Sequence, residues 1–284
     1  MSSLFKITPA RILKISESLP GAPRLLVELD KLLKDPNSDP TEIAAVLRRD
    51  LVLTGRIVRI ANGVVYSRGE PVGELEAALA RVGFGEIFRL ISVASMLQMT
   101  ELEFRFYPIT AKTLRENALF TALMMEALAP LVGIDPRLAF TAGLVRSVGR
   151  IVLDLAAQQE SRKVPIPQLQ PDGLVAWERS LFGMTNYQAS YHVLQAWRFP
   201  ADVAVAVRDQ LMHDLTVDPM PIAKLLHVSV AAAYGAGHSM AGGQYFIDNY
   251  TAKARGELGI TEEQVSSAVA AVDRQFQQMK DVLA

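Results

Sequence analysis

The ten residues TAGLVRSVGR, 141–150, interrupt a strongly apolar helical run with two adjacent polar side chains, Arg146 and Ser147. In a helix, residues three or four positions apart lie on the same face. Helical spacing therefore puts Arg146 in line with Ala142, Gly143, Gly149 and Arg150. Ser147 falls with Leu144 and Ile151, nearer the core. The stretch predicts a helix with a small-residue face that a neighbouring helix can approach closely.

Helical periodicity continues on both sides of this stretch, and no convincing run of alternating strand residues appears. Asp39 is a good N-cap, with Pro40 at the first helical position and Glu42 at the third. Thr261 and Gln264 form a capping-box pair before the last helix. We expect helices over residues 23–34, 40–49, 50–62, 74–82, 86–99, 110–129, from 136 through Arg146 and Ser147, and over 175–182, 186–197, 201–212, 221–234 and 262–282. The predicted fold class is all-α.

The segment MTELEFRFYP, 99–108, is the best candidate for a junction between two helical parts. Its periodicity lapses, and Pro108 stops any continuous helix. We expect an N-terminal helical subdomain over residues 1–107, packed on a multi-helical bundle over 108–284. The Gly-rich piece 235–243 is expected to be a loop, and it lacks the strand, helix and Lys of a phosphate-binding loop.

Composition restricts the class of protein further. Half of the 284 residues are hydrophobic and 21% are charged, which excludes a disordered chain. Lys plus Arg number 29 against 30 Asp plus Glu, and the net charge of -1 offers no general attraction to nucleic acid or anionic membrane. The chain has no Cys, which fits a reducing cytosol. The N-terminus lacks the apolar core of a signal peptide, and the most apolar windows fall short of the roughly 20 residues that span a bilayer. We expect a cytoplasmic protein with no membrane partner.

Three pieces of the N-terminal half follow one another in order: SLPGAPRLLVEL at 18–29, DPTEIAAVLRRD at 39–50 and LTGRIVRIANGVVYSRGEPVGELEAALARVG at 53–83. As a set they resemble the HDOD family, a branch of the HD superfamily of helical metal-dependent phosphohydrolases. The family's opening pattern LP..P is filled by Leu19, Pro20 and Pro23. Its later pattern RLLRLANSA.Y is matched at Arg59, Ala61, Asn62 and Tyr66. Leu51 departs from the family, which usually has Pro there. The resemblance covers at least 18–212 and implies that the bundle is a degenerate HD-like one.

The resemblance also implies that the metal site of the superfamily is missing. In the HD superfamily the stretch at 143–149 reads roughly GLLHDIG, and its His and Asp bind a metal ion. This chain has GLVRSVG, with Arg146 at the His position and Ser147 at the Asp position. The other His positions of the superfamily fall at Asn117, Asn186 and near Gln210. Each is a weak ligand or a non-ligand, so we expect no metal, no cofactor, no catalytic residue and no enzymatic activity.

Arg146 is a poor neighbour for a metal ion because its guanidinium is permanently charged. At about 4 Å, like charges repel by roughly 4 kcal/mol per unit charge at an effective dielectric of about 20. Two interpretations stay open: a solvated or salt-bridged residue in a vestigial cleft, or a group that holds a carboxylate or phosphate. The candidate ligand or partner cleft contains Asn117, Arg146, Ser147, Asn186 and Gln210.

Outside this stretch, the histidines and methionines show no spacing typical of a metal site or a binding groove. The four histidines have no paired spacing and no carboxylate partners at ligand intervals. His227 is expected in a core, His192 at a helix rim, and His213 and His238 in loops. Core filling is also the expectation for Met96, Met99, Met124, Met125 and Met184.

The one locally basic region contains Arg48, Arg49, Arg56, Arg59 and Arg68. Acidic residues stand beside it at Glu42, Asp50 and Glu70. No aromatic residues alternate with these arginines as a base-stacking platform requires. A salt-bridged surface is therefore favoured over a nucleic-acid site.

The resemblance implies a non-enzymatic bacterial signalling module, since HDOD domains are associated with signal transduction, alone or attached to receiver or cyclic-dinucleotide domains. It is expected to bind a protein partner or a small ligand. Two alternatives stay open: a metal-dependent nucleotide phosphohydrolase with residual activity, and a regulator that binds nucleic acid through the basic region. The sequence names neither the partner nor the oligomeric state.

Overall fold

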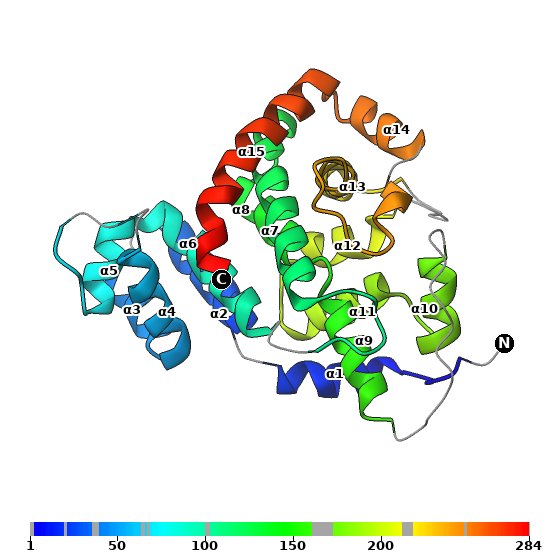
Figure 1. The fold of residues 1–284 in the computed structure, drawn as a ribbon, viewed down its shortest axis with the longest axis horizontal. Helices are drawn as coiled ribbons and strands as arrows, with labels where there is room; N and C mark the ends of the chain where they lie inside the picture. The colour runs from blue at the N-terminus through cyan, green and yellow to red at the C-terminus, as the bar shows by residue number, and fades with distance from the viewer. Residues whose placement is uncertain are drawn as a thin grey trace. The chain divides into compact units, whose positions relative to one another are not determined.

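The computed structural model describes residues 3–19, 22–35, 40–63, 66, 69–99, 103–160, 173–211, 218–246 and 249–283. These residues form helices joined by turns and loops, and no strand occurs among them (Figure 1). The predicted all-α class is confirmed. Among the helices described, none combines the length and the apolar character that crossing a bilayer requires.

The chain divides into two compact units. Unit 1 comprises Met1–Leu19 and Thr100–Phe276, and unit 2 comprises Pro20–Met99 and Gln277–Ala284. The division after Met99 falls within the predicted junction segment 99–108. The first 19 residues group with the second part of the chain. The subdomain boundaries 1–107 and 108–284 stay a prediction.

Unit 2 is built from short helices: α2 (Ala22–Lys34), α3 (Pro40–Leu47), α4 (Leu51–Ala61), α5 (Leu75–Val82) and α6 (Phe84–Met99). Helix α2 packs on α6 and α3, and α4 packs on α5 and α6. Asp50 caps α4 as predicted, because its carboxylate accepts from the Leu53 N–H at 2.9 Å. Asn62 then holds the following loop through two bonds of 2.8 Å with the backbone of Val72. Asp39, the predicted cap of α3, lies outside the described residues.

Unit 1 contains the remaining helices: α1 (Pro9–Ser18), α7 (Ala111–Leu128), η1 (Ala129–Val132), α8 (Pro136–Val145), α9 (Val148–Gln158), α10 (Leu174–Phe182), α11 (Asn186–Ala196), α12 (Ala201–Asp209), α13 (Pro221–Gly235), η2 (Gly243–Phe246), α14 (Asn249–Glu257) and α15 (Glu262–Leu283) as far as Phe276. The predicted capping box before α15 is confirmed by bonds of 2.8 and 3.2 Å between Thr261 and Gln264. The predicted core methionines are also confirmed, since all five are buried.

Helix α7 is buried on every side between Asn117 and Met125, where it packs along α8 and against α13. The predicted close approach of helices is present at both glycines of the central stretch. A Cβ added at Gly143 would lie 2.7 Å from the Cα of Ala122 on α7. One added at Gly149 would lie 2.0 Å from the carbonyl oxygen of Asn186 on α11. Side chains larger than hydrogen therefore do not fit at either position.

The continuous helix predicted through Arg146 and Ser147 is wrong, because α8 ends at Val145 and α9 begins at Val148. The hydroxyl of Ser190, from α11, occupies the break. It accepts from the Gly149 N–H at 2.8 Å and donates to the Arg146 carbonyl at 3.1 Å. In an unbroken helix both backbone groups would bond within the helix. A side chain inserted into the ladder is a recognised cause of a helix break.

Candidate functional site

Arg146 lies in the interior of unit 1, with 2% of its surface exposed. Its Nη1 donates to Oε1 of Gln210 at 3.0 Å, and its Nη2 donates to Oδ1 of Asn117 at 2.6 Å. The structure thus brings together three of the predicted site residues, from α7, from the end of α8 and from the end of α12. Both partners of the guanidinium are neutral amides.

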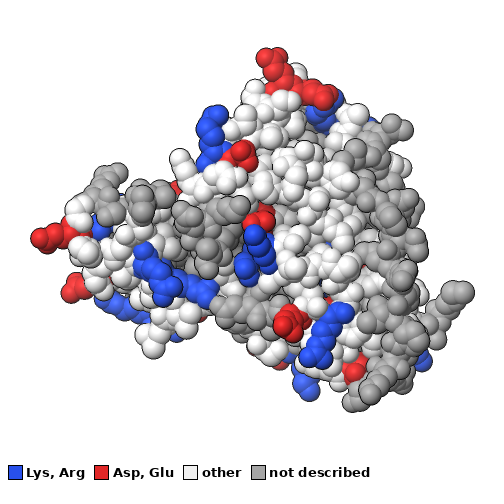
Figure 2. Space-filling view, in the orientation of Figure 1, with Lys and Arg blue, Asp and Glu red and all other residues white. Residues whose placement is uncertain are grey.

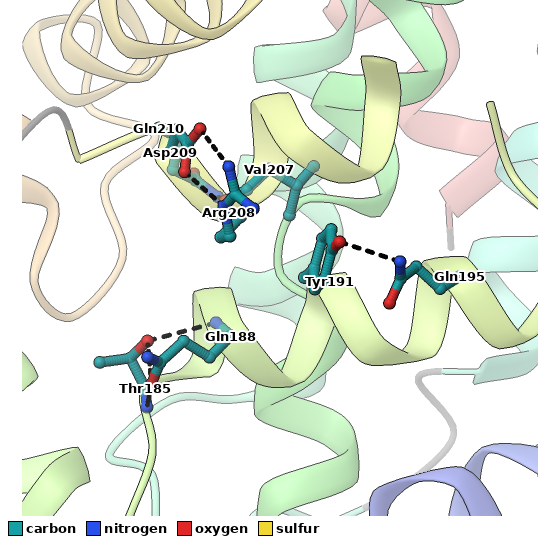
Figure 3. A network of polar contacts seen from close by, with 8 residues as sticks. All are labelled: Thr185, Gln188, Tyr191, Gln195, Val207, Arg208, Asp209 and Gln210. Carbon is teal, nitrogen blue, oxygen red and sulfur yellow. Dashed lines mark hydrogen bonds and ion pairs between the residues drawn. The ribbon is translucent and has the colours of Figure 1, made fainter. Parts of the chain in front are cut away.

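The two amides are held in place by bonds of their own. Asn117 Nδ2 donates to the carbonyl of His238 at 2.6 Å, and Gln210 Nε2 donates to the carbonyl of Val207 at 2.7 Å. Figure 3 shows Gln210 and Val207 at the end of α12, near α11. The backbone carbonyl of Gln210 bonds to Nδ1 of His227 at 2.8 Å. Helix α12 ends at Asp209, three residues earlier than predicted. These bonds fix which amide atoms face Arg146.

Asn186, another predicted site residue, belongs to a second buried network. Its N–H donates to Glu178 Oε2 at 2.8 Å, and its Nδ2 donates to Glu178 Oε1 at 2.9 Å. The hydroxyl of Tyr107 donates to the same Oε1 at 2.6 Å. A capping box of Thr185 and Gln188 starts α11 at this point (Figure 3). Asn186 therefore donates its hydrogen bonds to a buried carboxylate.

Arg150, one helical turn beyond Arg146, is a second buried arginine with 2% exposure. Its guanidinium carbon lies 5.6 Å from the ring centroid of Tyr107, and that of Arg146 lies 5.8 Å from the ring of Phe246. Such ring contacts favour a partly desolvated cation. Among the described residues, neither arginine forms an ion pair with a carboxylate.

Ser147, the fifth predicted site residue, is 1% exposed. It is the N-cap of α9, yet its side chain makes no capping hydrogen bond, and its Oγ has no hydrogen-bond partner. A serine at this position usually accepts from the helix's first turn. The hydroxyl is therefore available to another group.

The electrostatics follow from burial. Burial lowers the pKa of Arg146 to about 9; the proximity of Tyr187 opposes this shift, and the charge of Arg150 adds to it. The guanidinium is still protonated at neutral pH. Burial raises the pKa of Glu178, against the opposing effect of Arg150 and of the bonds from Tyr107 and Asn186. Burial similarly raises the pKa of Tyr187.

Sequence reasoning missed Glu178, Tyr107 and Tyr187 as members of the site. The available signal for Glu178 was a single carboxylate in the apolar run VAWERSLF. Asp154 gives the same signal in IVLDLAA, and it is also buried, where it accepts from the backbone N–H groups of residues 105–107. A single charged residue on an apolar helix face predicts a buried polar partner. The sequence does not say which residue that partner is, because the partner comes from another part of the fold.

A metal ion of the HD type does not fit these residues. Arg146 occupies the position between Asn117 and Gln210 with direct hydrogen bonds, so a cation there would meet a guanidinium instead of ligand lone pairs. Within the described ranges, no group of three or more His, Cys, Asp or Glu side chains is placed to hold a metal. We derive no chemistry through a metal at this site.

The predictions for the histidines are confirmed where the structure describes them. His227 is fully buried and hydrogen-bonded, as expected. His238 lies in a loop, and its ring stacks on Phe120 with centroids 4.3 Å apart. His213 and Arg68 lie outside the described residues.

In the basic region of unit 2, Arg48 pairs with Glu76, and Arg49 lies 3.0 Å from both carboxylate oxygens of Glu28. These are the contacts of a salt-bridged surface. Figure 2 shows blue basic side chains close to red acidic ones at several places on the visible face.

Unit 1 thus defines a class: a helical bundle whose interior contains five buried polar residues of the candidate site, Asn117, Arg146, Ser147, Asn186 and Gln210. The chain belongs to the HDOD domain family, whose profile matches residues 19–212. The match covers the three sequence pieces of the N-terminal half, apart from Ser18, and every position of the candidate site.

Solved structures share this fold at low sequence identity. An HDOD domain protein of unknown function from Geobacter sulfurreducens has a TM-score of 0.65 at 18% identity, over 95% of this chain and 96% of that one. A candidate signal transduction protein from Marinobacter aquaeolei has a TM-score of 0.66 at 19% identity, over 94% and 60%. A candidate phosphohydrolase from Shewanella amazonensis has a TM-score of 0.63 at 19% identity, over 97% and 98%. No curated protein matches the chain. At these identities the likeness establishes the fold.

Proposed function

We propose that the chain is a non-enzymatic regulatory module of bacterial signal transduction, which acts in the cytoplasm by binding a protein partner or a small ligand. Membership of the HDOD family supports this role. So does the candidate signal transduction protein of Marinobacter aquaeolei, which has the same fold. The proposed site comprises Asn117, Arg146, Ser147, Asn186 and Gln210.

One observation carries the non-enzymatic part of the proposal. The Arg146 guanidinium bonds directly to Asn117 and Gln210, at positions where the superfamily has metal ligands. Water activation by a metal ion needs an open coordination position next to anionic or imidazole ligands. A buried cation between two amides offers neither.

Affinity capture and ligand binding test the proposal. Tagged wild-type protein is expected to retain a specific partner or to bind a nucleotide in equilibrium dialysis. Arg146→Met should weaken that binding, whereas Arg49→Met, in the salt-bridged surface, should not. A wild-type protein that is monomeric, retains no partner and binds neither a nucleotide nor inorganic phosphate would count against a binding role.

The phosphohydrolase alternative has one observation in its favour, the candidate phosphohydrolase from Shewanella amazonensis that shares the fold. A phosphate-release assay with nucleotides in the presence of Mn²⁺, Fe²⁺ or Zn²⁺ decides it. Turnover that disappears when Asn117 is replaced by Leu would establish an enzyme. The absence of turnover with every metal would end this alternative.

A further inference from the structure

Several polar atoms around the break between α8 and α9 are buried without a hydrogen-bond partner. The donors among them are Nε of Arg146, Oγ of Ser147, Nε and Nη1 of Arg150, and the hydroxyl of Tyr187. None of the four residues is more than 2% exposed. Folded proteins satisfy about nine-tenths or more of their buried polar groups, so a local group of unsatisfied donors needs an explanation. Each of these atoms can donate a hydrogen bond.

The donors are close enough to act on one another. The charge of Arg150 contributes to lowering the pKa of Arg146, and both arginines act on the pKa of Tyr187. The side chain of Asn186 lies beside the Tyr187 hydroxyl and opposes the rise of its pKa; its Oδ1 is an acceptor that is also buried without a hydrogen-bond partner. Arg150 and Tyr187 directly follow Gly149 and Asn186, the two residues that meet where α9 contacts α11. Two guanidinium groups and a phenol therefore share one buried region.

The nearby carboxylates accept their hydrogen bonds from other groups. Glu178 accepts from Tyr107 and from the backbone and side chain of Asn186. Asp154 accepts from three backbone N–H groups and from Gln158. The charge of Arg150 acts on Glu178, but Nε and Nη1 of Arg150 and Nε of Arg146 have no acceptor among the described residues. Leaving a buried donor without an acceptor is destabilising.

A tetrahedral oxyanion supplies what this region lacks. It carries negative charge and several acceptor oxygens, which suit guanidinium N–H groups. The region also contains the N-terminus of α9, whose N-cap Ser147 makes no capping bond, and helix N-termini favour anions. Because the donors are enclosed, a small inorganic ion suits them better than the same group carried on a nucleotide.

We propose that Arg146, Arg150 and Tyr187 bind one small inorganic oxyanion of the phosphate class at the N-terminus of α9. This inference rests on the proposed ligand-binding function and names the ligand class for that site. The anion neutralises the buried arginines and thereby stabilises the α8–α9 break. Asn117 and Gln210 position the Arg146 guanidinium toward it.

The test is urea unfolding at increasing inorganic phosphate, with chloride adjusted to hold the ionic strength constant. Above the dissociation constant, each tenfold rise in phosphate should lower the unfolding equilibrium constant of the wild type about tenfold. Arg150→Met and Tyr187→Phe should lose this response. Arg208→Met is the matched control, because Arg208 pairs with Asp209 and is 41% exposed at its side chain, and it should keep the response. Arg150→Met should fold, since it keeps most of the side-chain volume and removes N–H donors that have no acceptor.

Phosphate also stabilises proteins non-specifically by exclusion from their surface, and that effect is the same in all variants. Ion chromatography of the denatured proteins shows whether the wild type already holds a stoichiometric oxyanion that Arg150→Met lacks. If it holds none, an equal response to phosphate in the wild type and Arg150→Met, or no response in either, would overturn the proposal. Stabilisation by AMP but not by inorganic phosphate would overturn the free-ion ligand. The binding function has a separate readout, which is partner capture. If the wild type captures a partner but no variant responds to phosphate, the oxyanion proposal fails and the binding function stays in place.

Discussion

Arginines in the two units of this protein have opposite surroundings. In unit 2, Arg48 and Arg49 lie at the surface, with side chains 60% and 62% exposed, and each pairs with a carboxylate. In unit 1, Arg146 and Arg150 are buried, Arg146 between two amides and Arg150 near an aromatic ring, and neither forms an ion pair within the part of the chain that the structure describes. Water screens the first pair, whereas the protein itself must compensate the second.

The difference explains why similar sequence signals have different meanings. A run of arginines beside acidic residues forms a solvated surface whose pairs each contribute little. Two arginines within an apolar helical run must be held by hydrogen bonds from other helices, and any donor left over is available to a ligand. The buried pair is therefore where a change in sequence has a structural cost and where a function is expected.

The largest effect on stability is expected from Arg146→Ala, which removes one of the two buried arginines. The change leaves Asn117 Oδ1 and Gln210 Oε1 without donors and opens a cavity, so the free energy of unfolding should fall by roughly 3–5 kcal/mol. Chemical denaturation measures it. Arg146→Met keeps most of the volume and should cost less. A loss of under about 1 kcal/mol for the alanine variant would show that the amides pair equally well without the guanidinium.

Gly149→Ala should have the next largest effect, about 3 kcal/mol, because the added Cβ meets the backbone of α11 at 2.0 Å. Gly256→Ala is the control, since its Cβ would meet nothing within 4 Å in α14. It should leave stability unchanged or raise it by roughly 0.5–1 kcal/mol. Equal effects of the two variants would contradict the close approach of α9 and α11.

Ser190→Ala should reduce the free energy of unfolding by about 2 kcal/mol, because it leaves the Gly149 N–H and the Arg146 carbonyl unpaired in the interior. Hydrogen exchange at Gly149 gives a local readout and should become faster in the variant. Unchanged exchange would indicate that the break between α8 and α9 has another cause.

The pH dependence of stability tests the carboxylate beside Arg150. Because burial raises the pKa of Glu178 above its usual 4.5, the carboxyl favours folding while it is protonated. This contribution is complete below the unfolded pKa and is lost as pH rises through the folded pKa, by about 1.4 kcal/mol per pKa unit of elevation. The stability of wild type relative to Glu178→Gln should therefore fall as pH rises. A relative stability that rises over this range would mean that the charged form is the favoured one.

The smallest effect on the free energy of unfolding is expected for Arg49→Ala, which removes an exposed arginine of unit 2. Its pair with Glu28 is solvent-exposed, so the loss should be within about 0.5 kcal/mol and should shrink further at high salt. Denaturation at low and high salt checks this. A loss comparable to that of Arg146→Ala would remove the contrast between the two regions.

Much of the fold was predictable because helix periods and caps are local. Asp50, and Thr261 with Gln264, cap the helices that the sequence assigns to them. The break after Val145 was not predictable, since it depends on Ser190 from another helix. Helix α1 was not predicted either. It packs on α9 and α11, which come much later in the sequence.

The candidate site was predictable in part. Family positions identified Asn117, Arg146 and Gln210, which the fold joins by direct hydrogen bonds. Spacing within one helix could not reveal that Asn186 serves Glu178, because their relation depends on the turn between α10 and α11. Burial is a tertiary property, so the unpaired N–H donors of Arg150 emerged only from the packed structure.

The metal content of the wild-type protein tests the central claim most directly. After dialysis against Mn²⁺, Fe²⁺ and Zn²⁺ and removal of free ions, elemental analysis should find no stoichiometric metal, because Arg146 occupies the site between Asn117 and Gln210. A stoichiometric ion that the wild type retains and Asn117→Leu releases would contradict the claim.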